Sequence, residues 1–243
     1  MTVKCRTCPI RRRDCFIPMT EGEVAAMERF KTGELTVDGR SSILMEGSNS
    51  PQLFTVLEGQ GLRYKTLPDG RRQVISFVFP GDFVGLQAGV MAEMRHSVES
   101  STRMRLCVFE RANLWAFFRD NPERAFDLTW LSAVEEHFLG ENVLTLGQRS
   151  AAERIAWAFL RIWERLDALG LRTNGSVPFP HRQQDLADAL GLSLVHTNKT
   201  LAKLRREQIA GWSDGRLTVL DTARLAELAQ AEEGEGAHRR PLL

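Results

Sequence analysis

Hydrophobic residues in the last third of the chain describe two short helices separated by a break. Between Gln183 and Leu190 they recur at helical spacing, and Gly191 then interrupts the pattern. Ser193 can cap a second helix, which runs through LVHTNKTLAKLRRE, residues 194–207. This stretch therefore predicts a helix-turn-helix.

A hairpin is predicted directly after these helices. Residues 209–212 and 216–220 alternate between apolar and polar positions, and Ser213-Asp214-Gly215 between them is typical of a tight turn. The order helix, glycine, serine, helix and hairpin predicts a winged helix-turn-helix that binds duplex DNA. The alternative is a small helical core with a solvated charged face.

The second helix has two chemically different sides. Its inner side is expected to bury Leu194, Thr197, Leu201 and Leu204. Its outer side carries His196, Asn198, Lys199, Lys203 and Arg206. Basic and amide groups are the side chains that bind phosphates and base edges, so the outer side is the predicted DNA-binding face.

The first half of the chain alternates like a small antiparallel β-roll. Short apolar runs lie between turn residues such as Pro68-Asp69-Gly70 and Pro80-Gly81-Asp82. Strand-like intervals separate Phe54, Val56, Leu62, Tyr64, Val74, Ser76 and Val78. A short amphipathic helix over Glu21–Lys31 precedes them. The fold class expected for the whole chain is α+β.

A long helix is expected to follow the roll. It begins at Asn121-Pro122 and continues to Leu146 without a proline, and it carries apolar side chains on more than one face. Such a helix either lies wholly inside one domain or packs against the same helix of a second subunit. The dimer interpretation uses Trp130, Leu131, Val134, Phe138 and Leu144. A second amphipathic helix is predicted over Ser150–Leu171, with Glu153 completing a capping box.

Composition restricts the function only broadly. The chain has 243 residues with 32 basic and 31 acidic side chains, so its net charge of +1 indicates little about a nucleic-acid partner. It has no apolar run as long as a membrane span and no signal peptide, and we expect a cytoplasmic protein. We find no catalytic motif and expect no enzyme activity.

Three of the four cysteines lie close together near the N-terminus. Cys5 and Cys8 form a C-x2-C pair, and Cys15 follows after a short loop. Such spacing allows thiolates to reach one metal centre, and Cys107, in an apolar strand-like run, is the only other cysteine. The set is compatible with an iron-sulfur cluster, with zinc or another metal, or with plain thiols.

DLADALGLSLVHTNKTLAKLRREQI, residues 185–209, resembles the DNA-binding motif of the Crp/Fnr family of bacterial transcription regulators. The resemblance implies a cyclic-nucleotide-binding-like β-roll, a long dimerisation helix and a winged helix-turn-helix. It also implies a homodimer on palindromic double-stranded DNA and contact with RNA polymerase. The corresponding boundaries are an arm at 1–19, the roll at 20–118, the long helix at 119–147, the DNA-binding domain at 148–230 and a mobile tail at 231–243.

The cysteines and their neighbours are most similar to the FNR branch of this family. In that branch three N-terminal cysteines and one from the roll hold an oxygen-sensing 4Fe-4S cluster, and the matching residues here are Cys5, Cys8, Cys15 and Cys107. The resemblance implies that oxygen or nitric oxide degrades the cluster, which weakens dimerisation and DNA binding. The alternative is a family member without a cluster, responding to another small ligand or to none.

Binding of cAMP, which several relatives perform, is disfavoured. The nucleotide-binding version has a glutamate soon after a glycine that corresponds to Gly85, whereas Leu86 and Gln87 follow here. It also has an Arg-Ser pair, and the nearest group here is Arg95-His96-Ser97. A ribose hydroxyl without an acceptor would cost on the order of 1–3 kcal/mol. We interpret His96 as a loop or surface histidine.

The recognition helix differs from that of the FNR branch. The branch reads its site with Glu, Ser and Arg, and the corresponding positions here are Val195, Asn198 and Lys199. Val195 cannot accept a hydrogen bond from cytosine, so a different site sequence is expected. The full predicted DNA-binding set is Ser193, Val195, His196, Asn198, Lys199, Lys203 and Arg206.

Overall fold

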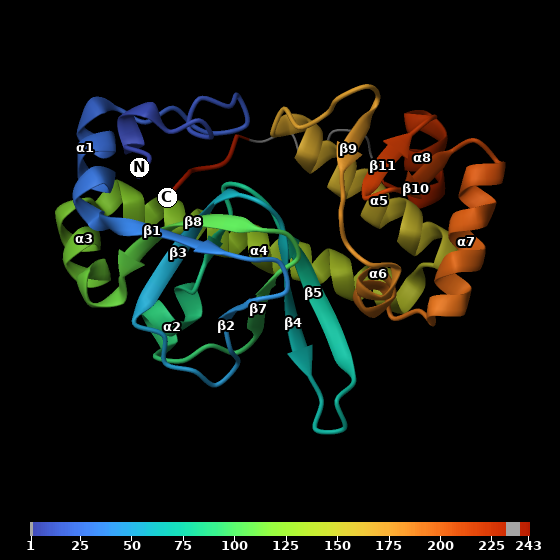
Figure 1. The fold of residues 1–243 in the computed structure, drawn as a ribbon, viewed down its shortest axis with the longest axis horizontal. Coiled ribbons are helices and arrows are strands. Elements are labelled where there is room, and N and C mark those ends of the chain that lie inside the picture. The colour runs from blue at the N-terminus through green and yellow to red at the C-terminus, as the bar shows by residue number, and fades with distance from the viewer. Residues whose placement is uncertain (1, 232–238) are drawn as a thin grey trace. The chain divides into compact units, whose positions relative to one another are not determined.

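The computed structural model describes residues 2–231 and 239–243. The chain divides into two compact units (Figure 1). One unit contains Met1–Glu135 together with Arg239–Leu243, and the other contains Glu136–His238. We call them the sensory unit and the DNA-binding unit, after the roles that the family resemblance implies for them.

The sensory unit is built on two antiparallel four-stranded sheets. The first sheet has the order β1-β8-β3-β6 and the second the order β2-β7-β4-β5. The bounds in the first sheet are β1 Lys31–Val37, β8 Met104–Glu110, β3 Gln52–Glu58 and β6 Phe83–Val84. Those in the second are β2 Ser42–Leu44, β7 Ser97–Ser100, β4 Gly61–Thr66 and β5 Arg72–Val78. The predicted β-roll is therefore confirmed.

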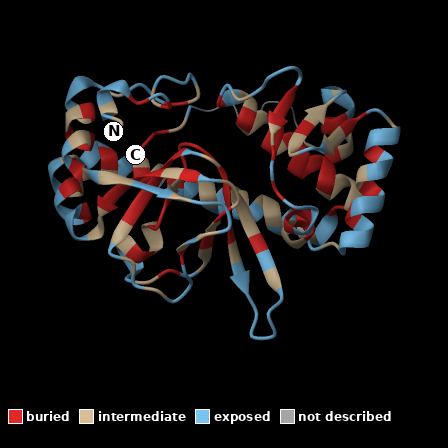
Figure 2. Cartoon of the chain, in the orientation of Figure 1, coloured by how far each residue is buried: buried red, intermediate tan, exposed pale blue. Residues whose placement is uncertain are grey.

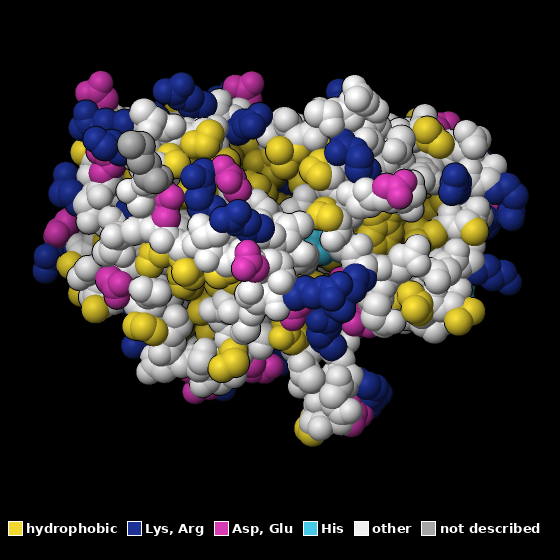
Figure 3. Space-filling view, in the orientation of Figure 1, with side chains coloured by type: hydrophobic (Ala, Val, Ile, Leu, Met, Phe, Trp, Pro, Cys, Tyr) yellow, Lys and Arg dark blue, Asp and Glu magenta, His cyan; other side chains and the backbone are white. Residues whose placement is uncertain are grey.

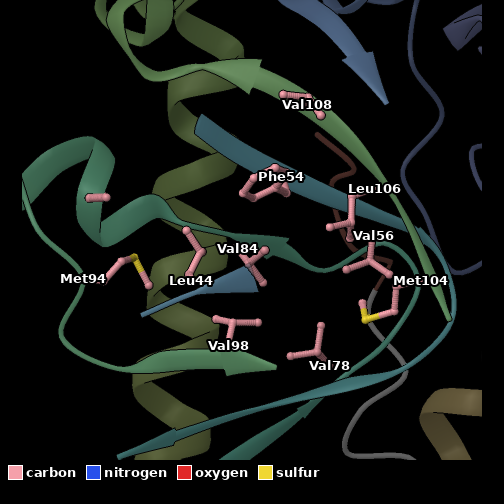
Figure 4. Packing of buried hydrophobic residues seen from close by; sticks show 11 residues of the cluster. Leu44, Phe54, Val56, Val78, Val84, Met94, Val98, Met104, Leu106 and Val108 are labelled. Carbon is pink, nitrogen blue, oxygen red and sulfur yellow. The ribbon is translucent and has the colours of Figure 1, made fainter. Parts of the chain in front are cut away.

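The core of the roll lies between the inner faces of the two sheets. Side chains from both sheets point toward one another there, as Figure 4 shows for Val56 and Leu106 opposite Val78 and Val98. Alternation along each strand accounts for this, since every second side chain of a strand points to the same face. The predicted turn at residues 68–70 joins β4 to β5, where Gly70 N donates to the Leu67 carbonyl at 2.9 Å.

Short helices flank the roll. They are η1 Cys5–Thr7, α1 Glu21–Phe30, α2 Leu86–Met91, η2 Arg111–Asn113 and α3 Leu114–Asp120. Helix α1 begins with a capping box in which Thr20 N donates to Glu23 Oε2 at 2.7 Å. Its last residue, Phe30, stacks on Phe117 of α3 with ring centroids 4.2 Å apart. The predicted short helix is confirmed, although Lys31 already belongs to β1.

The predicted long helix is α4, Pro122–Gln148. Its first half belongs to the sensory unit, where Leu128 and Leu131 are buried. In the same half, Arg63 Nη1 donates to Glu135 Oε2 at 2.8 Å, which ties β4 to the helix. The side chain of Asn121 does not cap α4. Its amide group donates instead to the Phe117 carbonyl, at the end of α3.

The DNA-binding unit combines helices with a small antiparallel sheet. Its helices after α4 are α5 Ala151–Ala168, α6 Gln183–Leu190, α7 Leu194–Arg206 and α8 Thr222–Ala229. Its strands are β9 Ser176–Pro178, β10 Ala210–Ser213 and β11 Arg216–Val219, in the order β10-β11-β9. Helix α5 opens with the predicted capping box, in which Ser150 N donates to Glu153 Oε2 at 2.6 Å. The inner side of α5 is buried along its length (Figure 2).

The end of the chain differs from the sequence-based expectation. Residues 232–238, part of the predicted mobile tail, lie outside the described residues. The remainder is not free: Pro241, Leu242 and Leu243 are buried in the sensory unit. The charged and Gly-bearing residues before Pro241 are typical of a mobile tail, which is why the whole segment was predicted to be mobile. The two adjacent leucines that follow them are apolar and are buried.

No helix in the described part of the chain combines the length and apolar character that a membrane span requires.

A buried histidine is expected to make the stability of the DNA-binding unit depend on pH. Burial lowers the pKa of His181 to about 4, and its ring lies 4.6 Å from that of Phe179. An unfolded histidine titrates near pH 6.5, so between about pH 6.5 and 4 the unfolded chain binds more protons. Stability is therefore expected to fall, by roughly 1–2 kcal/mol, as the pH is lowered from 7 to 5.

Chemical denaturation of the wild type, His181→Phe and His196→Phe across this pH range measures the effect. His181→Phe is expected to flatten the pH dependence of the free energy of unfolding. His196→Phe, at an exposed position of α7, is the matched control for replacing a histidine by phenylalanine. Equal slopes for wild type and His181→Phe would contradict the assignment.

Candidate DNA-binding surface and cysteine-lined cavity

The turn between α6 and α7 depends on left-handed backbone at Gly191. This residue has φ +62°, and a Cβ at its position would lie 3.3 Å from the side chain of Leu146. Leu192 N then donates to the Ala187 carbonyl at 3.0 Å, which closes the end of α6. Glycine is the residue that adopts this conformation without strain, so the break in the apolar pattern marks the actual turn.

Helix α7 starts at the predicted cap. Ser193 Oγ accepts a hydrogen bond from His196 N at 3.2 Å. Ser193 therefore satisfies a free backbone group of the helix, and its hydroxyl has a structural role.

The inner side of α7 differs in part from the predicted one. Thr197 and Leu204 are buried as predicted. Leu194 is 39% exposed and Leu201 only half-buried, whereas Thr200 is buried and donates from Oγ1 to the His196 carbonyl at 2.9 Å. The buried stripe thus follows a spacing of three to four residues from Thr197, and apolar character alone placed Leu194 on the wrong side.

The outer side of α7 is exposed over its whole length (Figure 2). Val195 is 80% exposed. The other members of the predicted set, which are also exposed, are Ser193, His196, Asn198, Lys199, Lys203 and Arg206. Arg205 is also exposed; it was not in the predicted set, although it lies beside Arg206 in a basic pair.

Positive charge gathers along α7 (Figure 3). Lys203 Nζ and Arg206 Nη2 each lie 4.0 Å from Glu207 Oε1, at the edge of ion-pair distance. Within the described residues Lys199 forms no ion pair. Exposed pairs of this kind contribute little energy, so the cations remain able to exchange Glu207 for a phosphate.

The predicted wing is the hairpin of β10 and β11. Its two-residue turn, Asp214-Gly215, has φ values of 52° and 69°, as a tight hairpin turn requires. Trp212 anchors the hairpin because its Nε1 donates to the Phe179 carbonyl at 2.9 Å. Arg216 donates from Nε to Ser176 Oγ at 2.6 Å, so this arginine holds β9 to the wing.

A small cavity in the sensory unit brings three of the four cysteines together. Cys5, Cys8 and Cys107 line it, and Leu242 and Leu243 lie on the same wall. Its volume is about 30 Å³. Cys15 is half-buried and does not line the cavity, and no three of the described histidine, cysteine or acidic side chains lie close enough together to hold a metal ion.

Burial dominates the acidity of these thiols. It raises the pKa of Cys107 to about 12, in spite of the Lys31 ammonium, which lowers it. Burial also raises the pKa of Cys5. The Nζ of Lys31 is 2.6 Å from Glu34 Oε1 and 2.6 Å from the Val3 carbonyl. One buried cation therefore connects the N-terminal arm to the strand beside Cys107.

The cavity brings three of the four predicted cluster ligands to one apolar space, but no three of the described cysteines lie close enough together to hold a metal ion. A cluster ligated by four thiolates would therefore require these cysteines to move closer together and Cys15 to join them. The fourth, Cys15, follows η1 in a segment whose backbone pairs elsewhere: its carbonyl accepts from Arg240 N at 2.8 Å. The sequence spacing could not show this, because the pairing partner is more than 200 residues away in the chain.

The positions that the family resemblance associates with a nucleotide have hydrogen-bond partners within the roll. Gly85 precedes α2 with φ +99°, and Gln87 Oε1 accepts from Arg95 N at 2.9 Å. Ser97 Oγ accepts from Glu46 N at 3.0 Å. His96 lies in the loop before β7, as predicted, and is half-buried there; burial lowers its pKa to about 4.

The predicted dimerisation residues of α4 divide into two groups. Leu131 is buried, and Phe138 stacks on Trp157 with ring centroids 6.0 Å apart. Trp130 and Val134 are half-buried, and Leu144 is exposed. Leu139 and Val143 are also exposed although they were not in the predicted set.

Comparison with known proteins agrees with this arrangement. Residues 34–121 match the cyclic nucleotide-binding domain, and residues 153–228 match the Crp-like helix-turn-helix domain. The chain is 32% identical over 234 residues to the nitrogen fixation regulation protein FixK of Bradyrhizobium diazoefficiens, which covers 93% of this chain and 94% of FixK. It is 34% identical over 193 residues to the transcriptional activatory protein AadR of Rhodopseudomonas palustris, with 79% of each chain covered.

A solved structure shows the same fold. FixK2 from Bradyrhizobium japonicum superposes with a TM-score of 0.73 at 26% identity, over 82% of this chain and 98% of FixK2. The transcriptional activator protein FnrL of Cereibacter sphaeroides is 29% identical over 96% of this chain and 94% of FnrL. With both domain types present in the family order, this chain belongs to the Crp/Fnr family of DNA-binding transcription regulators.

Proposed function

We propose that the protein is a homodimeric regulator that reads a palindromic DNA site through α7 and contacts RNA polymerase there. The observation that carries the proposal is the exposed outer side of α7, which joins basic and amide side chains on a helix-turn-helix. An α-helix fits the major groove, and its first turns reach the base edges.

The side chains of α7 divide between bases and phosphates. Asn198 and Lys199 lie in the first half of the helix, where they address adenine and guanine edges. Val195 offers an apolar contact, which suits a thymine methyl group. Lys203 and Arg206, nearer the end of the helix, and His196 are assigned to phosphates, which fix register and orientation.

A second subunit is assigned to the exposed apolar side of α4. Leu139 and Val143 are four residues apart and therefore lie on one face of the helix, with Leu144 beside them. A parallel pair of such helices would hold two copies of α7 on a two-fold axis, about one helical turn of DNA apart.

The proposed signal site is the cysteine-lined cavity together with Cys15. Cys5, Cys8 and Cys107 would hold one face of a 4Fe-4S cluster, and Cys15 would complete the set after its loop moves toward the cavity. A bound cluster would supply sensitivity to oxygen and nitric oxide. Lys31 would offset thiolate charge at Cys107, because its ammonium already lowers the pKa of that thiol.

A second candidate is a regulator of the same type without a cluster. The position of Cys15 outside the cavity and the buried, high-pKa thiol of Cys107 favour it. In this version the DNA-binding role is unchanged, and the signal is another small ligand or none. We infer that cAMP is not the signal, since an apolar Leu86 follows Gly85.

Lys199→Ala and Arg206→Ala are expected to change DNA binding in different ways. Loss of Lys199 should cost about 1–3 kcal/mol on the preferred site and relax discrimination at one base pair. Loss of Arg206 should weaken all sites alike and reduce the slope of log affinity against log salt by about 1. Binding-site selection followed by salt titrations measures both.

Lys65→Ala is the matched control for these variants, because Lys65 is an exposed lysine of the sensory unit that pairs with Glu46. It should bind DNA like the wild type. An unchanged sequence preference in Lys199→Ala would contradict the assignment of that residue to a base.

Val143→Asp is expected to separate the dimer. Val143 is 71% exposed, so an aspartate costs little within one subunit but places two charges together in the proposed interface. Val90→Asp, at a similarly exposed valine of α2, is the control and should remain dimeric. Sedimentation analysis distinguishes these outcomes, and a Val143→Asp dimer as stable as the wild type would contradict this interface.

Anaerobic purification tests the cluster. The wild type is expected to contain about four iron and four sulfide per chain and to absorb in the visible region, and air should bleach it. Cys15→Ser should lose most of the iron and sulfide. A colourless anaerobic wild type without iron would exclude the cluster and leave the second candidate.

A further inference from the structure

Segment Arg240–Leu243 lies in the sensory unit although it follows the DNA-binding unit in the chain. Leu242 and Leu243 are each 5% exposed, and Pro241 is buried beside them. Apolar side chains that end a charged stretch are usually exposed, so their burial indicates a specific binding place. We call residues 240–243 the docked segment.

Polar contacts fix the docked segment to the loop that carries Cys15. Arg240 N donates to the Cys15 carbonyl at 2.8 Å, and Ile17 N donates to the Arg240 carbonyl at 2.8 Å. These two bonds form a parallel bridge around Phe16. Arg240 Nη1 also lies 3.3 Å from Asp82 Oδ1, and Thr55 Oγ1 donates to the Leu243 carbonyl.

The loop itself is held by a tight contact. Phe16 is 2% exposed and packs against Gly81, where a Cβ would lie 2.2 Å from Phe16 Cζ. Because Phe16 is fixed there and Arg240 pairs on both sides of it, the backbone of Cys15 is held in its present place. The docked segment therefore helps to keep the fourth cysteine out of the cavity.

The leucines of the docked segment also fill the space in front of the other cysteines. They line the cavity together with Cys5, Cys8 and Cys107, and the volume that remains is about 30 Å³. A space of this size holds on the order of one or two water molecules. No three of the described cysteines lie close enough together to hold a metal ion, so three or four thiolates can converge on one metal centre only if the leucines leave this space.

We propose that Arg240–Leu243 is an internal plug of the cysteine cavity, so that docking of this segment and binding of a thiophilic metal centre by the cysteines exclude one another. This inference rests on the proposed signal site for its ligand, but docking itself does not require a cluster. Docking lowers the apparent affinity of the cysteines for metal by the fraction of molecules in which the cavity is open.

Thiol labelling tests docking without any metal. Each cysteine of the reduced protein is labelled with a maleimide and its rate is followed by mass spectrometry. Leu242→Asp/Leu243→Asp is expected to raise the rates of Cys8 and Cys107 by about tenfold or more, since labelling of buried thiols follows local opening. Leu67→Asp, at an exposed leucine of the sensory unit, is the matched control and should match the wild type.

A synthetic peptide separates loss of docking from general unfolding. A peptide of residues 239–243 added to the double variant should slow labelling of Cys8 and Cys107, and a peptide with aspartates in place of both leucines should not. Wild-type labelling rates in the double variant would overturn the proposal. So would fast labelling that the native peptide does not slow.

Cadmium titration tests the competition. Cd²⁺ added anaerobically to the reduced chains reports thiolate ligation through its ultraviolet charge-transfer band. The double variant is expected to bind Cd²⁺ about tenfold more tightly than the wild type and Leu67→Asp. Equal affinities, or no binding by any of the three, would overturn the competition. If only the proposed iron-sulfur cluster is wrong, the wild type will contain no iron, but the double variant will still be labelled faster than the wild type at Cys8 and Cys107.

Discussion

The presentation of α7 depends on one short piece of left-handed backbone at Gly191. It ends α6 and lets the chain turn so that Ser193 caps the next helix. Because Thr197 and Leu204 are then buried, the opposite side of α7 must face solvent. The exposed positive charges on that side contribute little to the stability of the unit. A polyanionic partner explains why they gather on one face.

The sequence was most informative where local rules are strongest. The turn at Gly191, the cap at Ser193 and the hairpin at Asp214-Gly215 each depend on residues that are close together in the chain, and each was predicted. The inner side of α7 was predicted only in part. Thr200 is buried and Leu194 exposed because helical geometry, rather than apolar character, decides which positions face the core.

Long-range contacts were beyond sequence reasoning. Nothing in the spacing of the cysteines indicated that Leu242 and Leu243 would share a cavity with them. Nor did the pattern of α4 show which apolar residues face inward: Leu131 is buried, whereas Val143 remains exposed. Both outcomes depend on contacts between segments far apart in the chain, which a periodic pattern does not contain.

The DNA-binding role and the proposed signal site rest on different observations. DNA binding follows from the family and from the face that α7 exposes, while the proposed signal site rests on the small region shared by Cys15, the cavity and the docked segment. Lys31 belongs to that region as well, since its ammonium contacts the N-terminal arm and Glu34. A change at the cysteines would therefore affect both the N-terminal arm and the docked segment.

Hydroxyl-radical footprinting on a selected duplex tests the central claim most directly. If two copies of α7 enter successive major grooves, the protein should protect two symmetric sets of backbone positions about 10 base pairs apart, each set flanking a half-site. A single protected patch, or no protected patch on any duplex that the protein retains, would contradict the claim.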